Sequence, residues 1–394
     1  MKKENLKSTL VASASFLILL DRPIQYIFES LISVTLPTNR LVVIIALMIF
    51  SLDKKINLSK RDISFLILTI SSFIIGTIIL PEYKTSDVIA AIGVIFPFYI
   101  GNKLIELDNN KVGKIFLAVN SLIFFILFLV VTGLGGNIFE LKYQLHMIGL
   151  ILEKRPEIFT DQNFQILYLL SPPLILLFSK SNKYKLVVAI TMLLYLYSLN
   201  FVQSRTGFIF YVLFILSIVF IMKEKNKLKL LISGFIISIM STFLILTLHS
   251  HIIENFAIYE RFTSHTNSTA GHRLHSLMFV FERLFYLEYW VPNGSYEFSM
   301  LYGGKPHSNI TAFYLVGGIL GLIGYIALIV QPIIKLWLKF KTYRTDRKIL
   351  IVIATTVLIA QLTLNLPFNE QVWFWAGLSI GILKCSKKEE RRRY

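Results

Sequence analysis

Long runs of apolar residues alternate with short lysine- and arginine-rich segments along most of this 394-residue chain. A helix rises about 1.5 Å per residue, so most of these runs are long enough to cross a bilayer core of about 30 Å. Apolar residues make up 55% of the sequence and charged residues only 16%, whereas soluble domains contain about 25% charged residues. The pattern excludes a soluble multidomain protein and predicts an all-α, polytopic membrane bundle.

The apolar runs predict a single transmembrane domain covering residues 1–394, with about twelve transmembrane helices. Asp21-Arg22-Pro23 follows the first run and no small-residue cleavage pattern is present, so we expect a retained span and not a removed signal peptide. The expected spans cover residues 10–20, 41–52, 63–80, 88–100, 115–132, 164–178, 186–202, 208–222, 230–248, 310–330, 349–366 and 372–383.

The basic residues test the number of spans and their orientation. In a soluble protein, a net charge of +17 would suggest nucleic-acid binding. With both termini cytoplasmic, however, 29 of the 40 lysines and arginines fall in cytoplasmic segments. This positive-inside bias predicts that most of the charge sets orientation, and we expect no nucleic-acid partner. All seven histidines fall on the external side, where we therefore look for chemistry.

Two predicted external segments are longer than turns, at residues 133–163 and 249–309. Loops of this length are usually functional or disordered, and these contain too many aromatic and apolar residues to be disordered. The second is the large external loop between the ninth and tenth spans. Apolar residues recur in it every three or four positions, which predicts an amphipathic helix near residues 273–289 on the membrane surface.

Several common chemistries find no support in the sequence. The single cysteine, Cys385, lies in the basic C-terminal tail, so no disulfide within the chain and no external thiolate chemistry are expected. No P-loop, dinucleotide-binding or zinc-protease motif is present. His272 and His275 are three residues apart, but no carboxylate or cysteine at ligand spacing accompanies them. We expect neither a metal nor a cofactor.

Three external residues are candidates for the chemistry, although each also has a simpler interpretation. Arg205 lies in a very short loop and is either a phosphate ligand or an interfacial anchor; Arg273 is either a phosphate ligand or a solvated charge. His307 opens the tenth span and is either a proton acceptor or a helix cap. Two guanidinium groups at the surface suit the diphosphate of a lipid-linked substrate, and this combination suggests glycosyl transfer. Aromatic rings in the loop, for stacking on sugars, belong to Tyr286, Tyr289 and Trp290.

The order of short motifs resembles the O-antigen ligase and polymerase superfamily, in particular its Wzy-type polymerases. The motifs are Ser204-Arg205-Thr206-Gly207, Gly271-His272-Arg273, Pro292-Asn293-Gly294, His307-Ser308-Asn309 and the glycine-rich stretch 317–324. The resemblance implies a metal-independent, inverting transfer at the periplasmic face of the bacterial inner membrane during lipopolysaccharide synthesis. It also implies undecaprenyl-diphosphate-linked oligosaccharides as donor and acceptor, and a chain-length regulator as a further partner.

The same resemblance implies the roles of individual residues. Arg205 and Arg273 are expected to bind the diphosphate of the donor, with Arg261 as an additional ligand. His307 is expected to deprotonate the hydroxyl of the acceptor sugar. A ligase that transfers finished O-antigen to lipid A core remains an alternative, since it would use nearly the same residues. A lipid-oligosaccharide flippase is an alternative of another class, which predicts charges inside the bundle.

Overall fold

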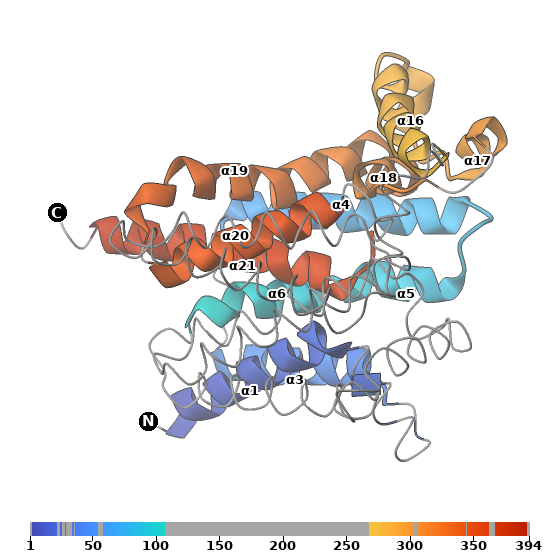
Figure 1. The fold of residues 1–394 in the computed structure, drawn as a ribbon. Coiled ribbons are helices and arrows are strands. Elements are labelled where there is room, and N and C mark those ends of the chain that lie inside the picture. The colour runs from blue at the N-terminus through green and yellow to red at the C-terminus, as the bar shows by residue number, and fades with distance from the viewer. Residues whose placement is uncertain are drawn as a thin grey trace, which may run out of the picture.

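The structure is a computed structural model that describes residues 2–21, 36–53, 58–106, 268–302, 306–343, 345–361 and 367–391, and the single positions 24, 25, 28 and 34. Within these ranges every regular element is a helix, which confirms the predicted all-α class for this part of the chain (Figure 1). The elements are α1 (Lys2–Leu19), α3 (Thr38–Asp53), α4 (Lys60–Ile79), α5 (Thr85–Gly93), α6 (Ile95–Leu104), α16 (Ser268–Arg283), η4 (Leu287–Trp290), α17 (Tyr296–Tyr302), α18 (Asn309–Tyr325), η5 (Ile326–Val330), α19 (Gln331–Leu338), η6 (Phe340–Thr342), α20 (Thr345–Gln361) and α21 (Glu370–Arg391).

Three described helical segments are long and apolar enough to cross a membrane. They are α4, the pair α5 and α6, and the run from α18 to α19. The remaining long helices α1, α3, α20 and α21 coincide with other expected spans. The expected spans between residues 115 and 248 lie outside the described residues, so the number twelve stays a prediction.

The helices α1 and α3 run antiparallel, and α1 and α21 also contact each other end to start. Lys7 near the start of α1 contacts Asp53, the last residue of α3, with Nζ and Oδ2 2.7 Å apart. At the opposite end, the side chain of Gln371 in the first turn of α21 donates to the carbonyl of Leu19 at 3.1 Å. The start of α1 and the last turns of α21 therefore lie at one end, with α16 and α17 at the other (Figure 1). We call these the terminal end and the loop end.

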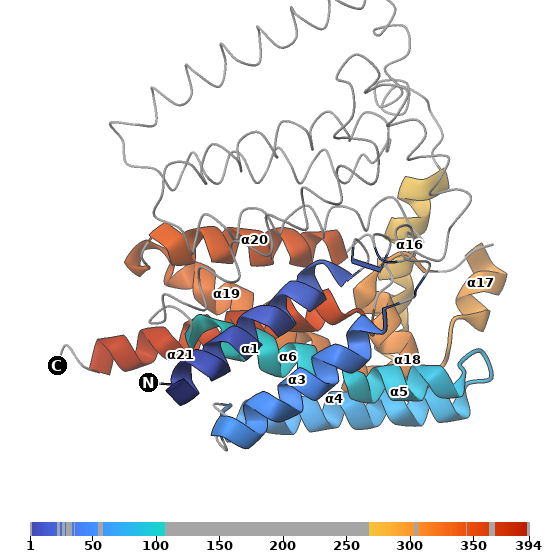
Figure 2. The ribbon, with the colours of Figure 1, turned by 90° about the horizontal axis from the view of Figure 1, so that it is seen from below.

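Glycine residues allow two pairs of helices to touch backbone to backbone. A Cβ on Gly76 of α4 would overlap the carbonyl oxygen of Val316 in α18. In the same way, a Cβ on Gly101 of α6 would overlap the carbonyl of Phe374 in α21, and one on Gly377 would overlap that of Phe98. Inside a bilayer, helices associate through close packing because burying apolar surface gains little there. Figure 2 shows α1 and α3 side by side next to α6, completing this part of the bundle.

α18 is broken in the middle, which its uniformly apolar sequence did not reveal. Gly318 has φ 60° and ψ −154°, a conformation that is strained for any residue with a side chain. The rings of Phe313 and Tyr325, on either side of the break, are 4.9 Å apart, whereas twelve residues of straight helix span about 18 Å. The two halves therefore bend toward each other. The expected span 310–330 is a bent helix that continues through a π-helix, η5, into α19.

Candidate functional site

A buried serine joins the external helix α16 to the beginning of α18. The backbone amide of His307 donates to Oγ of Ser276 at 3.3 Å, and Oγ1 of Thr311 donates to the Ser276 carbonyl at 2.7 Å. Ser276 and Thr311 are both fully buried. These two hydrogen bonds fix the segment that carries His307 against α16.

This contact brings two of the predicted site residues to the same place. Arg273 lies in α16 three residues before Ser276, and residues three apart are neighbours on a helix surface. The backbone position of Arg273 is therefore within about one helical turn, roughly 5 Å, of the serine that holds His307. Arg205 and Arg261 lie outside the described residues, so their places in the site stay predictions.

His307 is exposed between two buried neighbours at the loop end. Pro306 precedes it and Ser308, which is fully buried, follows it. Ser308 occupies the N-cap position of α18 with an extended backbone, but its side chain makes no cap hydrogen bond, and its Oγ has no hydrogen-bond partner. An exposed imidazole therefore lies beside the amino end of a helix, where backbone amides favour negative charge.

The three predicted stacking residues lie together around η4. Tyr286 and Trp290 are exposed, and Tyr289 is partly buried. The rings of Tyr286 and Tyr289 are 6.3 Å apart and nearly perpendicular. Nε1 of Trp290 donates to the carbonyl of Leu284 at 3.0 Å, which fixes the orientation of the indole. These rings thus form an anchored aromatic surface next to α16.

Arg283 packs against this aromatic surface, a contact that was not predicted from the sequence. Its guanidinium carbon is 3.5 Å from the ring centroid of Phe279 and 4.8 Å from that of Tyr289. The same guanidinium forms an ion pair with Glu297 of α17. Arg283 is thereby used for packing. Its spacing of four residues from Phe279 was the only sequence signal of this contact.

The Pro292-Asn293-Gly294 turn is inserted at the break of α18. The amides of Asn293 and Gly294 both donate to the carbonyl of Leu315, each at 3.1 Å. Carbonyls at the end of a helical segment lack partners within the helix, so the turn satisfies one that the break leaves exposed. A Cβ on Gly318 would overlap the carbonyl of Trp290, so the turn fits only against glycine.

A distant carboxylate fixes the other side of the turn. The amide and the hydroxyl of Ser295 donate to the two oxygens of Glu82, at 2.7 and 2.8 Å. Glu82 belongs to the connection between α4 and α5, more than two hundred positions away in the sequence. Burial, followed by the nearby carboxylates of Glu82 and Asp87, raises the pKa of the adjacent Tyr83. Glu82 was not among the predicted site residues because nothing in its local sequence indicates this contact.

The histidines that suggested a metal alternative have other surroundings. His275 stacks on Tyr302 with ring centroids 4.9 Å apart, and His272 lies one turn earlier in α16. In the part of the chain that the structure describes, no three histidine, cysteine or carboxylate side chains are grouped to hold a metal ion.

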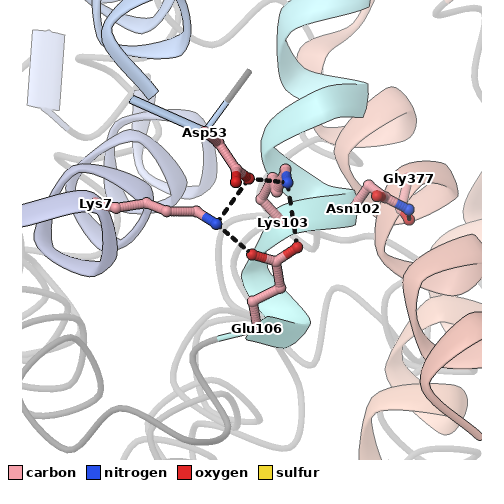
Figure 3. A network of polar contacts seen from close by, with 6 residues as sticks. All are labelled: Lys7, Asp53, Asn102, Lys103, Glu106 and Gly377. Carbon is pink, nitrogen blue, oxygen red and sulfur yellow. Dashed lines mark hydrogen bonds and ion pairs between the residues drawn. The ribbon is translucent and has the colours of Figure 1, made fainter. Parts of the chain in front are cut away.

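The most extensive polar network lies at the terminal end (Figure 3). Nζ of Lys7 is 2.7 Å from Asp53 and 2.6 Å from Glu106, and the fully buried Lys103 pairs with the same two carboxylates. Burial opposes the charged form of Asp53, but hydrogen bonds from Lys103 and Lys7 outweigh it and lower the pKa of Asp53. Two positive and two negative charges from three elements thus neutralise one another.

No protein-family model, curated protein or solved structure matches the chain. The functional assignment therefore rests on the residues and their geometry.

Proposed function

We propose that this protein is a polymerase of O-antigen or a related surface polysaccharide. It transfers the growing glycan from undecaprenyl diphosphate to the next lipid-linked repeat unit, at the periplasmic face of the bacterial inner membrane. The described helices support a membrane location, since three segments are long and apolar enough to cross a bilayer.

The Ser276 contact is the observation that carries the proposal. It holds the exposed His307 against the helix that contains Arg273, so a proton acceptor and a cation lie at one end of the bundle. An acceptor hydroxyl and a leaving diphosphate need these two groups side by side. The aromatic surface of Tyr286, Tyr289 and Trp290 offers sugar rings a place to stack at the same end.

In the proposed reaction His307 removes the proton from a hydroxyl of the acceptor sugar. The resulting oxygen nucleophile attacks the anomeric carbon of the donor from the side opposite the diphosphate, and the bond from that carbon to the diphosphate oxygen breaks. Arg273 and Arg205, with Arg261 in addition, stabilise the negative charge of the leaving diphosphate. Inversion at the anomeric carbon follows from this single displacement, which requires no metal.

Gene deletion and complementation in the native host test the proposal. We expect wild-type protein to restore a ladder of lipopolysaccharide chain lengths, and His307→Ala to leave one repeat unit on the core. His275→Ala is the matched control, because His275 is also exposed on the same face but stacks on Tyr302. The control should retain the ladder.

Other outcomes assign the protein differently. Loss of all antigen from the core, with lipid-linked polymer accumulating, would show a ligase. Lipid-linked single units retained on the cytoplasmic side would show a flippase. A normal ladder in the His307→Ala strain would exclude His307 as the general base. A chain-length regulator remains the proposed protein partner, to be detected as a change in the ladder when such a gene is deleted.

A further inference from the structure

An open groove of about 450 Å³ runs along the outside of the bundle between α4 and the bent helix. It is lined by Arg61, Phe65, Ile323, Ile326, Ala327 and Gln331. Its lining is almost entirely apolar except at the end formed by Arg61 and Gln331. The groove lies toward the terminal end, away from His307, so its function does not depend on the proposed polymerase reaction.

Exposed apolar side chains surround the groove, as expected of a face that contacts lipid. Ile323 and Ile326 are 39% and 50% exposed, and Ile67 on the neighbouring turn of α4 is 60% exposed. In an apolar, membrane-spanning segment such side chains contact acyl chains. One wall contains the π-helix η5, and π-helical turns inside α-helices are frequent at functional sites.

The length of the groove matches one leaflet of a bilayer. Ile323 and Gln331 are eight residues apart, which corresponds to about 12 Å along a helix. Half of a bilayer core measures roughly 15 Å. The groove therefore extends from the membrane interface, at Arg61, nearly to the bilayer midplane. A single acyl chain lying along it would place its headgroup beside Arg61.

The end of the groove formed by Arg61 and Gln331, which we call the mouth, carries charges that favour one kind of lipid headgroup. Arg61 donates to Oε1 of Gln331 across the mouth, and Lys60 precedes it in the first turn of α4. Lys335 lies one turn beyond Gln331 on the same face of α19. Asp62, the acidic residue of this turn, points its carboxylate toward Lys384 at 3.4 Å. The mouth therefore carries an excess of positive charge, which complements an anionic headgroup.

We propose that this groove binds one anionic glycerophospholipid from the leaflet at the Arg61 end. Its acyl chain lies between Phe65 and Ile326, and its phosphate is held by Arg61, with Lys60 and Lys335 nearby. The positive-inside distribution predicts this leaflet to be the cytoplasmic one. The bound lipid fills the space beside η5 and joins α4 to α19.

Native mass spectrometry of the purified full-length protein, titrated with phosphatidylglycerol or phosphatidylethanolamine, tests the site. For the first bound lipid we expect wild-type protein to prefer phosphatidylglycerol about fivefold, the factor provided by one basic residue near an anionic headgroup. Arg61→Gln should abolish this preference. Ile326→Trp fills the groove and should weaken the first binding step for both lipids.

Two matched variants separate the groove from general effects of charge and bulk. Arg40→Gln removes an exposed arginine at the start of α3, at the loop end, and should keep the preference. Ile334→Trp changes an isoleucine that is 53% exposed but outside the groove, and should bind like wild type. Equal affinity for both lipids in wild type, or unchanged binding in Ile326→Trp, would overturn the proposal. Displacement of phosphatidylglycerol by polyprenyl phosphate would also overturn it, because the groove would then hold a different lipid. The same holds if the protein is a dimer that Ile326→Trp dissociates, because a second copy would then cover the groove.

Discussion

At the terminal end, four charged side chains from three elements neutralise one another, whereas at the loop end the imidazole of His307 is exposed beside the buried hydroxyl of Ser308. Lys103 is fully buried, yet it contacts two carboxylates. The Oγ of the buried Ser308, in contrast, has no hydrogen-bond partner among the described residues. Both ends use polar groups to hold elements together, but the four-charge network lies at the terminal end and the exposed imidazole at the loop end.

This contrast separates two roles of polar residues in the same bundle. Polar groups with partners inside the protein stabilise the fold, and their removal should lower stability without acting on chemistry. Exposed groups at the loop end, such as His307, should affect activity more than stability. The following experiments therefore compare effects on activity, stability and local opening at the two ends.

The largest expected effect is on activity at the loop end. If His307 is the proposed general base, His307→Ala should reduce polymer formation by at least about 100-fold, because such a base contributes about that factor or more. The hydrogen bond to Ser276 comes from the backbone and is kept in the variant, so the loss of activity should exceed the loss of folded protein, which the melting temperature in detergent measures. Polymer formation is measured with lipid-linked repeat units and purified protein. A large fall in melting temperature would show that the imidazole is structural.

At the terminal end, Lys103→Met should destabilise the folded protein by about 3 kcal/mol, because Asp53 and Glu106 lose a buried partner. Activity per folded molecule should be unchanged. Denaturant titration in detergent micelles measures the effect. Lys384→Met is the matched control: its ion pair with Asp62 is partly exposed and should contribute less than about 1 kcal/mol. Equal effects of the two substitutions would contradict the structural role of the network.

A smaller effect on stability is expected at the loop end, where the charged side chain of Glu82 holds the turn at residues 292–294. Glu82→Gln weakens two hydrogen bonds from Ser295 and should destabilise the turn at residues 292–294 by about 1 kcal/mol, since the carboxylate is exposed. Limited proteolysis between α16 and α18 should become faster, with little change in the melting temperature of the bundle. Asp87→Asn, in the first turn of α5, is the comparison variant: its carboxylate accepts from the amide of Lys84 and not from Ser295, so proteolysis should be unchanged.

The smallest expected effect is the pH dependence of the contribution that Asp53 makes to stability. The pKa of Asp53 is lowered in the folded protein, so its contribution is present above its ordinary value of 3.8 and is lost as the pH falls further. Wild type should therefore melt at a higher temperature than Asp53→Asn at pH 7, and the difference should shrink below pH 3.8. A difference that grows on acidification would contradict the direction of this pKa shift.

Hydropathy predicted the three described segments that are long and apolar enough to cross a membrane, because such a segment needs about 20 apolar residues. The basic residues predicted that both termini lie on the cytoplasmic side, and this placement stays a prediction, as does the number of spans. The same alternation placed Arg273 and His307 on one side of the membrane. The hydrogen bonds through which Ser276 joins their two segments could not be predicted, because a single serine in an amphipathic helix is not a recognisable motif.

Other structural features could not be predicted from the sequence, for different physical reasons. The break at Gly318 lies within a run of apolar residues, and hydropathy does not record backbone angles. Glu82 and Ser295 are far apart in the sequence, so only the antiparallel packing of α4 and α18 brings them together. Asp53 and Glu106 looked like ordinary residues at the ends of spans. Their role depends on α1, α3 and α6 meeting at the terminal end, where Lys7 bridges Asp53 and Glu106 and Lys103 bridges the same two carboxylates.

The carbonyl of Leu315 has a consequence for how the protein is made. A backbone carbonyl without a partner costs several kcal/mol in hydrocarbon, so the bent helix is a poor candidate for insertion alone. The amides that satisfy this carbonyl belong to Asn293 and Gly294, which leave the ribosome before Leu315 does. The chain order thus produces the donor turn ahead of the helix that needs it, and α18 can fold onto a partner already made.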